Sequence, residues 1–273
     1  MKTSVFQQFR DFVYQQAGID LPAGKEALIR GRIGKRMRSL EIEDELIYLE
    51  YVKGDRSGEE LIEFLDAVST NYTHFFREND HFELLTEFLK NRKFDEKSPK
   101  LRIWSAASSS GEEPYSIAMT TAEALAGRGL AANVDVRILA TDISTRVLRL
   151  ACAGRYSDQE VESIPGPLRH KYLVRDRVNG EYEACDAVKE MLTFRRLNLA
   201  TPPYPMQGPF DVVFCRNVMI YFDKAVRTRL LNEIQRLLVP GGLLLVGHTE
   251  SLAGIPLRLR MVRPSVYVKE ADA

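Results

Sequence analysis

The sequence predicts an α/β protein in which an all-helical domain precedes a domain built on a mostly parallel sheet. Three observations predict this fold class. From residue 101 onward, short apolar strand-like runs alternate with amphipathic helices, a pattern typical of right-handed βαβ units. The first 90 or so residues show helical periodicity only. An Asn179-Gly180 pair between β-prone runs indicates a small antiparallel insert in the α/β part.

Composition limits the class of protein. The 273 residues are 45% hydrophobic and 28% charged, which excludes a disordered tail and a collagen-like repeat. No apolar run approaches the roughly 20 residues that cross a bilayer, so we expect no membrane insertion. Cys152, Cys185 and Cys215 are odd in number and lack C-x-x-C spacing, which predicts a cytoplasmic protein without disulfides or a zinc site. The 38 basic and 38 acidic residues balance, which argues against a nucleic-acid partner.

Residues 1–90 are expected to form the helical domain. An apolar stripe predicts its first helix, ended by Gly18; the stripe is Val5, Phe6, Phe9, Phe12 and Val13. A second helix is expected to begin near Pro22, with an apolar side of Ile29, Ile33, Met37 and Leu40. Its other side carries Arg32, Lys35 and Arg38, with Arg36 at the boundary. Because residues 30–38 contain no acid, we expect an acidic partner to meet the protein there. Further helices are expected at 45–52, 59–68 and 81–89.

The polar residues 91–100 are expected to be a linker, followed by the α/β domain over 101–273. Its predicted strands are 101–107, 136–141, 210–215, 243–246 and 265–269. Its predicted helices are 112–125, 145–153 and 224–238. The antiparallel insert is expected at about residues 170–197, from the runs 171–175, 181–185 and 191–197.

The carboxyl end of the first predicted strand is the expected ligand site, since open parallel sheets bind ligands there. Residues 104–115 read W-S-A-A-S-S-S-G-E-E-P-Y, without a G-x-G-x-x-G fingerprint. Glu112 and Glu113 at the helix start would repel a pyrophosphate. The pocket therefore suits a ligand with hydroxyls and a positive charge, such as S-adenosylmethionine, which has no phosphate. The alternative is that both acids only cap the helix dipole.

Asp142 ends the second predicted strand. A carboxylate at this place accepts hydrogen bonds from ribose hydroxyls in dinucleotide-binding folds. The alternative is that Asp142 caps the following helix, a role for which Ser144 is a rival. Two acids at successive strand ends would converge on one crevice, which favours the ribose interpretation.

Long ordered motifs then carry a family resemblance. Residues 104–115, 70–77 (T-N-Y-T-H-F-F-R), 214–222 (F-C-R-N-V-M-I-Y-F) and 243–250, ending G-H-T-E, resemble motifs of the CheR-type chemotaxis receptor methyltransferases. The resemblance spans residues 5 to about 269. It implies an S-adenosylmethionine-dependent (Rossmann-like) methyltransferase domain that methylates glutamate side chains on cytoplasmic chemoreceptor helices, tunes chemotactic adaptation and releases S-adenosylhomocysteine.

The resemblance also implies roles for single residues. Asn71, Thr73 and Arg77 would close over the cofactor, and Ala107 and Glu113 would line its methionine end. Asp142 would hold the ribose, Asn198 and Leu199 would flank the adenine, and Cys215 with Arg216 would complete the wall. Arg77 and Tyr221 are the expected catalytic residues, as orienting groups. Simpler alternatives are that Asn71 starts a helix and that Cys215 is a small buried apolar residue. Apolar neighbours predict that Arg77 and Arg216 are buried and need partners.

The chemistry explains why the sequence shows no catalytic triad. A glutamate carboxylate, with a pKa near ~4.3, is already ionised at neutral pH, so no general base is required. What remains is desolvation and in-line placement. The four histidines, His74, His81, His170 and His248, show no metal-ligand spacing, so no metal is expected.

The partner implied is a methyl-accepting chemotaxis receptor, whose acidic helices would meet Arg32, Lys35, Arg36 and Arg38. The insert resembles a β-subdomain that docks a receptor C-terminal peptide, although the compact turn at 177–180 argues against such a tether here. We expect a monomer. The rival functions are methylation of RNA or a small molecule, and a non-catalytic adaptor that only senses S-adenosylmethionine.

Overall fold

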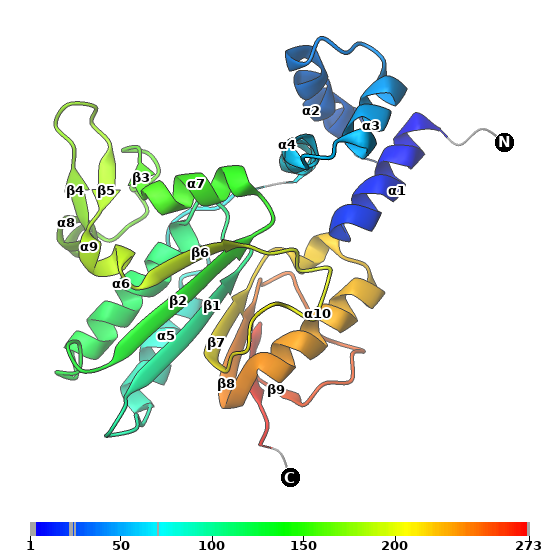
Figure 1. Ribbon diagram of the computed structural model, residues 1–273. Helices are drawn as coiled ribbons and strands as arrows, with labels where there is room; N and C mark the ends of the chain where they lie inside the picture. Colours follow the sequence, from blue (N-terminus) through cyan, green and yellow to red (C-terminus); the bar gives the residue numbers. More distant parts are fainter. Residues whose placement is uncertain (1–3, 22–23, 25, 70, 272–273) are drawn as a thin grey trace.

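A computed structural model describes residues 4–21, 24, 26–69 and 71–271. Its first four helices form a bundle with its own core (Figure 1): α1 (Val5–Ala17), α2 (Glu26–Ser39), α3 (Glu45–Gly54) and α4 (Glu59–Val68). The predicted stripe of α1 is confirmed, because Phe6, Phe9, Phe12 and Val13 are buried. Gly18 ends this helix in a left-handed conformation (φ 67°). Pro22, the expected start of the second helix, lies outside the described residues.

An ion pair lies at the edge of this bundle's core. The guanidinium Nε of Arg36 donates to a Glu60 oxygen at 2.9 Å, and the Tyr48 hydroxyl donates to the same carboxylate at 2.8 Å. The Glu60 side chain is only 5% exposed. Burial and the Glu60 contact both raise the pKa of Tyr48, so its hydroxyl stays protonated. Arg36 therefore neutralises a carboxylate that would otherwise be buried without a counter-charge.

The fifth helix, α5 (Asp80–Asn91), does not belong to this bundle. Its buried Phe82, Leu85 and Leu89 pack into the core beside α6 (Glu112–Ala126). We expected residues 1–90 to form the helical domain and 91–100 the linker, and the structure corrects both boundaries. The amphipathic pattern of α5 correctly indicated an apolar face, but periodicity does not say which core that face joins.

The main sheet has seven strands in the order β6-β2-β1-β7-β8-β10-β9. The first five are parallel, and β10 and β9 are added antiparallel. Their bounds are β1 (Lys100–Ala106), β2 (Asp135–Asp142), β6 (Leu192–Arg196), β7 (Phe210–Cys215), β8 (Leu238–Val246), β9 (Leu259–Arg263) and β10 (Val266–Lys269). Every residue of β7 is buried, as expected for a strand covered on both faces. The predicted α/β architecture is thus confirmed.

Helices cover both faces of this sheet. One core packs against α5 and α6, and the other, around Trp104 and Phe210, packs against α10 (Lys224–Leu237). α7 (Thr145–Ala153) lies beside β6 and β2. In Figure 1 the helical bundle stands near the carboxyl ends of the parallel strands, with α4 close to the start of α7. An ion pair at 3.7 Å between Arg146 and Asp66 joins these two helices.

A second, three-stranded antiparallel sheet forms the insert, in the order β3-β5-β4. It consists of β3 (Arg155–Tyr156), β4 (Leu173–Arg175) and β5 (Tyr182–Ala184), with the short helices α8 (Gly166–Tyr172) and α9 (Asp186–Lys189) beside it. The hairpin predicted from Asn179-Gly180 is confirmed by the pairing of β4 with β5.

The expected extent of the insert, about 170–197, is corrected at both ends, because β3 at residues 155–156 already belongs to its sheet. Residues 192–196 form β6, which pairs in parallel with β2 at the edge of the main sheet. A strand-like run shows β propensity, but its partner depends on the path of the chain. Within the described part of the chain, no helix is long and apolar enough to span a membrane.

The Arg36–Glu60 pair gives a stability prediction. Arg36→Ala should lower the free energy of unfolding by about 1–3 kcal/mol, because Glu60 keeps its burial and loses its counter-charge. Lys35→Ala, one position earlier on the exposed side of α2, is the control and should change stability by less than about 0.5 kcal/mol. Urea unfolding followed by circular dichroism measures both. Equal stability of the two variants would contradict a structural role for Arg36.

Candidate active site

A cavity of about 350 Å³ lies where the carboxyl ends of β1, β2 and β7 face the helical bundle. Six stretches of chain contribute most of its lining: residues 17–21, 71–77, 107–113, 142–143, 197–199 and 216–222. Leu28, Ile29 and Arg32 of α2 add a wall from the bundle. The cavity is thus formed jointly by the sheet domain and the helical bundle.

Ten of the eleven side chains predicted to bind cofactor or act in catalysis line this cavity. They are Asn71, Thr73, Arg77, Ala107, Glu113, Asp142, Asn198, Leu199, Arg216 and Tyr221. Cys215 is the exception. Its thiol is fully buried in β7, packed in the core shared with Trp104 and Leu244. The expectation that Cys215 forms part of the wall stays a prediction, and its burial agrees with the simpler alternative of a small buried residue. Thr70, in the same motif as Asn71, lies outside the described residues.

The loop after β1 is bound to the end of β2 through Asp142. The Asp142 carboxylate is 7% exposed and accepts hydrogen bonds from the backbone N–H of Ser109 (2.9 Å) and of Ser144 (3.0 Å). The Ser144 hydroxyl accepts from Val147 N and caps α7. Ser144 thus has the capping role that was the alternative for Asp142. Burial raises the pKa of Asp142, and the two N–H donors oppose that rise.

The two acids at the start of α6 have different surroundings. Glu112 is buried and accepts from the Ser110 hydroxyl, whereas Glu113 lines the cavity. The Ser105 hydroxyl donates to Glu113 at 2.7 Å, and Arg216 contacts its other oxygen at 3.2 Å. Burial raises the pKa of both carboxyls, although Arg216 opposes the rise at Glu113. Only Glu113 can therefore present a carboxylate to a ligand.

Arg216 is the central charge of the site. Its side chain is 1% exposed and contacts three groups: Glu113, Glu78 at 2.9 Å and the backbone carbonyl of Arg77. The guanidinium also lies 5.7 Å from the Phe82 ring centre. The prediction that Arg216 is buried and paired is confirmed. Arg77, by contrast, is only half-buried and donates to the Tyr72 carbonyl at 3.0 Å, so the expectation of a buried Arg77 is wrong.

Glu250 holds the loop that carries Tyr221. Its carboxylate accepts from three backbone N–H groups, those of Gly247 (2.7 Å), Met219 (2.7 Å) and Asn217 (2.8 Å). A Cβ at Gly247 would lie 2.5 Å from the Asn217 amide, so only glycine fits beside this carboxylate. Burial raises the pKa of Glu250, and the N–H groups counteract it. Glu250 belongs to the motif at residues 243–250, but the sequence did not indicate a role for it.

The carboxyl end of α1 contributes a wall that sequence reasoning missed. The Asp20 N–H donates to the Tyr221 carbonyl at 2.8 Å, and Ile19 forms an antiparallel bridge with Phe222. The Tyr14 hydroxyl donates to Asp223 at 2.6 Å. These contacts join segments some 200 residues apart, so no local pattern could have revealed them.

The same end of α1 also contacts Asn198, one of the two residues predicted to flank the adenine. The Asn198 side-chain amide donates to the Gln16 carbonyl at 2.7 Å, while its side-chain oxygen accepts from Ala200 N. Asn198 therefore fixes the backbone of its own segment through two hydrogen bonds. Leu199, the next residue, lines the cavity.

The four predicted receptor-binding residues of α2 have different surroundings. Arg32 lines the cavity and donates to the carbonyls of Val68 and Ser69. Arg36 is held by Glu60. Lys35 and Arg38 are exposed, and neither has an ion-pair partner within the described parts of the chain. The sequence thus identified a basic helix correctly, and binding of a receptor by these four residues stays a prediction.

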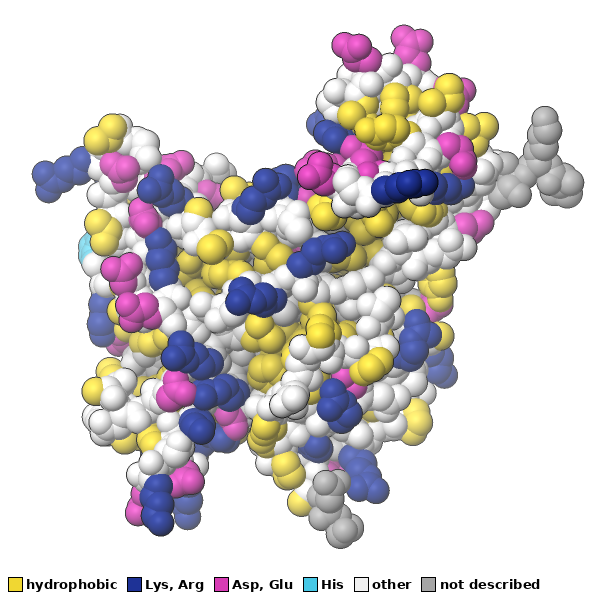
Figure 2. Space-filling model, viewed as in Figure 1, with side chains coloured by type: hydrophobic (Ala, Val, Ile, Leu, Met, Phe, Trp, Pro, Cys, Tyr) yellow, Lys and Arg dark blue, Asp and Glu magenta, His cyan; other side chains and the backbone are white. Residues whose placement is uncertain are grey.

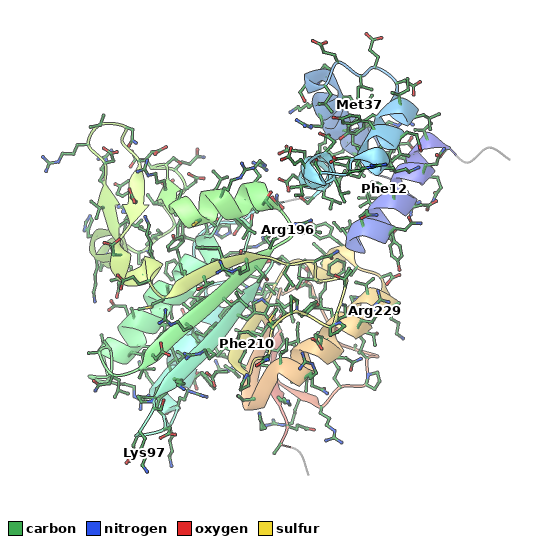
Figure 3. The ribbon with its side chains drawn as sticks, viewed as in Figure 1. Phe12, Met37, Lys97, Arg196, Phe210 and Arg229 are labelled. Carbon is green, nitrogen blue, oxygen red and sulfur yellow. The ribbon has the colours of Figure 1, made fainter. Side chains whose placement is uncertain are left out.

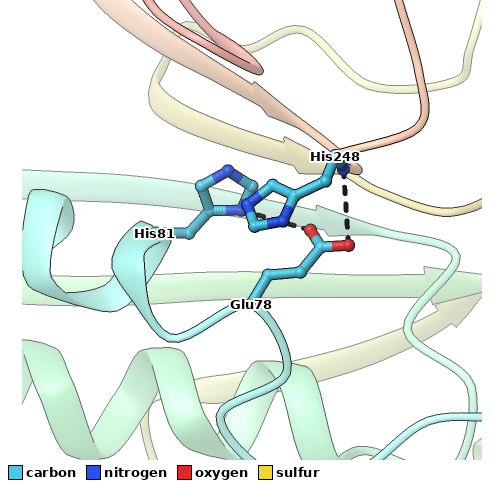
Figure 4. Close-up of side chains that lie close together, drawn as sticks. All are labelled: Glu78, His81 and His248. Carbon is cyan, nitrogen blue, oxygen red and sulfur yellow. Dashed lines mark hydrogen bonds and ion pairs between the residues drawn. The ribbon is translucent and has the colours of Figure 1, made fainter.

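Glu78, His81 and His248 form a cluster beside the Arg216 network (Figure 4). One ligand atom from each lies within 4.8 Å of the others, although their spacing in the sequence gave no sign of it. Glu78 already accepts from Arg216, the Asn217 amide and His248 N. Burial would raise the pKa of Glu78, but Arg216 and these donors hold it below its usual value. The Glu78 carboxylate is already hydrogen-bonded, and the Arg216 guanidinium contacts it directly. This cluster is therefore better suited to an ion-pair network than to a metal.

Glu78 itself was missed by sequence reasoning. The only available signal was its position, directly after the T-N-Y-T-H-F-F-R motif, where an acid follows an arginine expected to need a partner. The partner it contacts is the arginine of a different motif, Arg216, 138 residues further along the chain. Motif order alone does not indicate such a pairing.

Comparison with known proteins places the chain in one family. The model described as "CheR methyltransferase, SAM binding domain" matches residues 71–268, and "CheR methyltransferase, all-alpha domain" matches residues 4–69. "Chemotaxis protein methyltransferase 2" of Pseudomonas aeruginosa is 39% identical over 96% of this chain and 91% of its own length. "Chemotaxis protein methyltransferase" of Escherichia coli is 36% identical over 98% and 91%. Among solved structures, a DszA carbon methyltransferase covers 72% of this chain and 37% of its own, at 20% identity and a TM-score of 0.39.

His81 gives a prediction about pH. Its ring is completely buried without a hydrogen-bond partner for either nitrogen, and burial together with Arg216 lowers its pKa from 6.5 to about 4. Between pH 6.5 and 4, His81 is therefore protonated in the unfolded chain and neutral in the folded chain. Stability should fall as pH decreases through this window, by up to about 3 kcal/mol from this group, and the contribution levels off below pH 4.

The measurement is urea unfolding of wild type and His81→Phe between pH 4 and 7.5. The variant should show a smaller loss of stability on acidification, because phenylalanine has no proton to bind. His170→Gln, at an exposed histidine of α8, should keep the wild-type slope. Identical pH profiles for wild type and His81→Phe would show that His81 does not contribute.

Proposed function

Because the chain belongs to the CheR methyltransferase family and is an S-adenosylmethionine-dependent chemotaxis methyltransferase, we propose that it methylates glutamate side chains on cytoplasmic helices of chemoreceptors. One observation of the site carries this proposal. The cavity at the strand ends is lined by two carboxylates of the sheet domain, Asp142 and Glu113, and by Asp20 after α1, and Arg32 of α2 lines it from the bundle. A cofactor pocket and a surface for an acidic partner are thus adjacent.

The chain's own residues fit S-adenosylmethionine. A carboxylate has about four acceptor positions, and Asp142 uses two for backbone N–H groups. The remaining two can accept from the ribose hydroxyls. Glu113, whose carboxylate is shared with Arg216, would accept from the ammonium group, and Ala107, which also lines the cavity, has only a methyl side chain and leaves room for the approach. Leu199 would pack on the adenine, next to the Asn198 segment anchored on α1.

Asn71, Thr73 and Arg77 would close the cavity from the segment that joins the two domains. The backbone of this segment is fixed at one end by the Ser109 hydroxyl, which donates to the Asn71 carbonyl at 2.9 Å. At the other end Arg216 holds the Arg77 carbonyl. Arg77 itself keeps a half-exposed guanidinium at the cavity, from which it can orient an incoming carboxylate.

The cofactor supplies an activated methyl group bound to a positively charged sulfur. A receptor glutamate is already ionised at neutral pH, so the protein needs no base to prepare it. One carboxylate oxygen forms a bond to the methyl carbon while the carbon–sulfur bond breaks and its electron pair stays on sulfur. The protein's task is to exclude water and to hold the two groups in line. Tyr221 would serve that role; it lines the cavity, and its backbone carbonyl accepts a hydrogen bond from the Asp20 N–H.

We further propose that the enzyme acts as a monomer in the cytoplasm and does not depend on a receptor C-terminal peptide at the insert. The cytoplasmic location follows from the proposed substrate helices. The hairpin turn supports the absence of a tether, since residues 176–181 are closed by short backbone hydrogen bonds between Asp176, Gly180 and Glu181. Static light scattering and calorimetry with such a peptide test these two points.

The decisive test is incubation with methyl-labelled S-adenosylmethionine and a receptor cytoplasmic fragment. Carboxyl methyl esters release methanol in mild base, whereas methyl groups on nitrogen or carbon do not. Base-labile label on the fragment, lost when its methylated glutamates are replaced by alanine, supports the proposal. Base-stable label would indicate a different acceptor, and no label would leave a cofactor-binding adaptor.

Asp142→Ala should weaken binding of S-adenosylmethionine by about 1.5–3 kcal/mol, which is roughly a 10- to 150-fold rise in Kd. The reason is the loss of hydrogen bonds from ribose to a charged acceptor. Ser144→Ala, which removes the α7 cap and leaves the carboxylate in place, should bind within about threefold of wild type. Calorimetry measures both. A similar loss in the two variants would mean that Asp142 acts only by ordering the loops.

Tyr221→Phe removes only a hydroxyl and leaves the backbone bond to Asp20 intact. At saturating receptor, kcat should fall about tenfold or more, while the Kd for cofactor stays unchanged, because the hydroxyl is proposed to orient the transfer. Single-turnover methyl transfer beside a binding curve measures this. Tyr51→Phe, on the exposed side of α3, is the matched control. A wild-type rate for Tyr221→Phe would remove Tyr221 from the catalytic residues.

A further inference from the structure

Two segments of the sheet domain that border the cavity are rich in arginine and contain no acid. They are residues 143–153, which include α7, and residues 191–200, which include β6. Their four arginines, Arg146, Arg149, Arg195 and Arg196, are all exposed. We call these four residues the arginine face. Figure 2 shows dark blue side chains along this side of the molecule, over α7 and β6.

The arginine face adjoins the cavity directly. Arg196 is paired in register with Asp142, so both lie at the carboxyl end of the sheet. The Arg196 Nε donates to the Ile143 carbonyl at 3.2 Å, and both Ile143 and Leu197 line the cavity. Figure 3 shows Arg196 at the end of β6, near the start of α7. The arginine face therefore lies next to the edge of the cavity that Asp142, Ile143 and Leu197 form.

Most of its charge is not neutralised within the chain. Arg146, whose side chain is half-exposed, forms a long ion pair at 3.7 Å with the buried carboxylate of Asp66. Arg149, Arg195 and Arg196 have no carboxylate partner within the described ranges; Arg195 and Arg196 donate only to backbone carbonyls. Lys35 and Arg38 of α2, across the cavity, are also exposed and have no carboxylate partner among the described residues. Cations without a carboxylate partner thus lie on both the sheet domain and α2.

We infer that the arginine face binds the acidic flank of the receptor helix whose glutamate enters the cavity, opposite Lys35 and Arg38 of α2. This inference rests on the proposed function, which supplies the partner. A helix carrying several glutamates has charge complementary to both walls, and exposed charges at a rim accelerate encounter and are screened by salt. Docking between two walls would also fix the direction in which the substrate helix crosses the cavity.

The test compares Arg149→Glu and the double variant Arg149→Glu/Arg195→Glu with wild type on a receptor cytoplasmic fragment. KM should rise at least fivefold for the single variant and further for the double variant at low salt. The difference should shrink towards wild type at 0.5 M salt, because screening removes the lost attraction. Arg260→Glu, the same charge reversal on the exposed strand β9 at the far edge of the sheet, should leave KM unchanged.

Direct binding of the fragment, followed by fluorescence anisotropy, decides the inference separately from catalysis. Weaker binding by the arginine-face variants, with cofactor Kd and melting temperature unchanged, supports it. Binding and KM within twofold of wild type at low salt would overturn it, even if wild type forms base-labile esters and the proposed function stands. A variant that loses affinity for a DNA duplex but not for the receptor fragment would also overturn it. Failure of the proposed function appears differently, as the absence of esters with wild type.

Discussion

The buried guanidinium of Arg216 is the interaction on which the site's arrangement depends. It lies at the end of β7 and contacts Glu113 at the start of α6, Glu78 before α5 and the carbonyl of Arg77. One charge thus joins the sheet, a helix that covers it and the segment between the two domains. Burying a charged group without a counter-charge is energetically unfavourable. The buried guanidinium and the two largely buried carboxylates therefore stabilise one another and hold the three elements together. Burial raises the pKa of Glu113, the Arg216 guanidinium opposes that rise, and the nearby Glu78 carboxylate adds to it.

Around this centre, single carboxylates organise the loops at the strand ends. Asp142 holds the loops after β1 and β2, and Glu250 holds the loops after β7 and β8. Both carboxylates are buried, and both accept hydrogen bonds from backbone N–H groups that would otherwise have no partner. The turn geometry depends on this support, since Ala107, Ser109 and Asn217 all have positive φ. Strained loops held by buried acids give the cavity a fixed shape before any ligand arrives.

The helical bundle forms part of the cavity wall. The end of α1 bonds to the backbone of Tyr221 and, through Asn198, to the segment that borders the cavity. Arg32 of α2 lines the same cavity. Helix α2 is therefore continuous with the walls of the cavity. If a receptor helix binds α2 as proposed, it docks on an element that also forms the cavity.

The sequence by itself determined which segments fold and where the chemistry lies. Apolar periodicity located the stripe of α1 and the strands of the sheet, Asn179-Gly180 located the hairpin, and the motifs placed Glu113, Asp142 and Arg216 at one cavity. These features are local, because burial and turn geometry depend on neighbouring residues. Tertiary structure alone decided that α5 joins the sheet domain, that β6 leaves the insert, that Cys215 faces the core, and that Glu78 pairs with Arg216. Each of these outcomes depends on contacts between residues far apart in the sequence. Residue type and spacing indicate whether a side chain has to be buried or paired, but not which distant group is its partner.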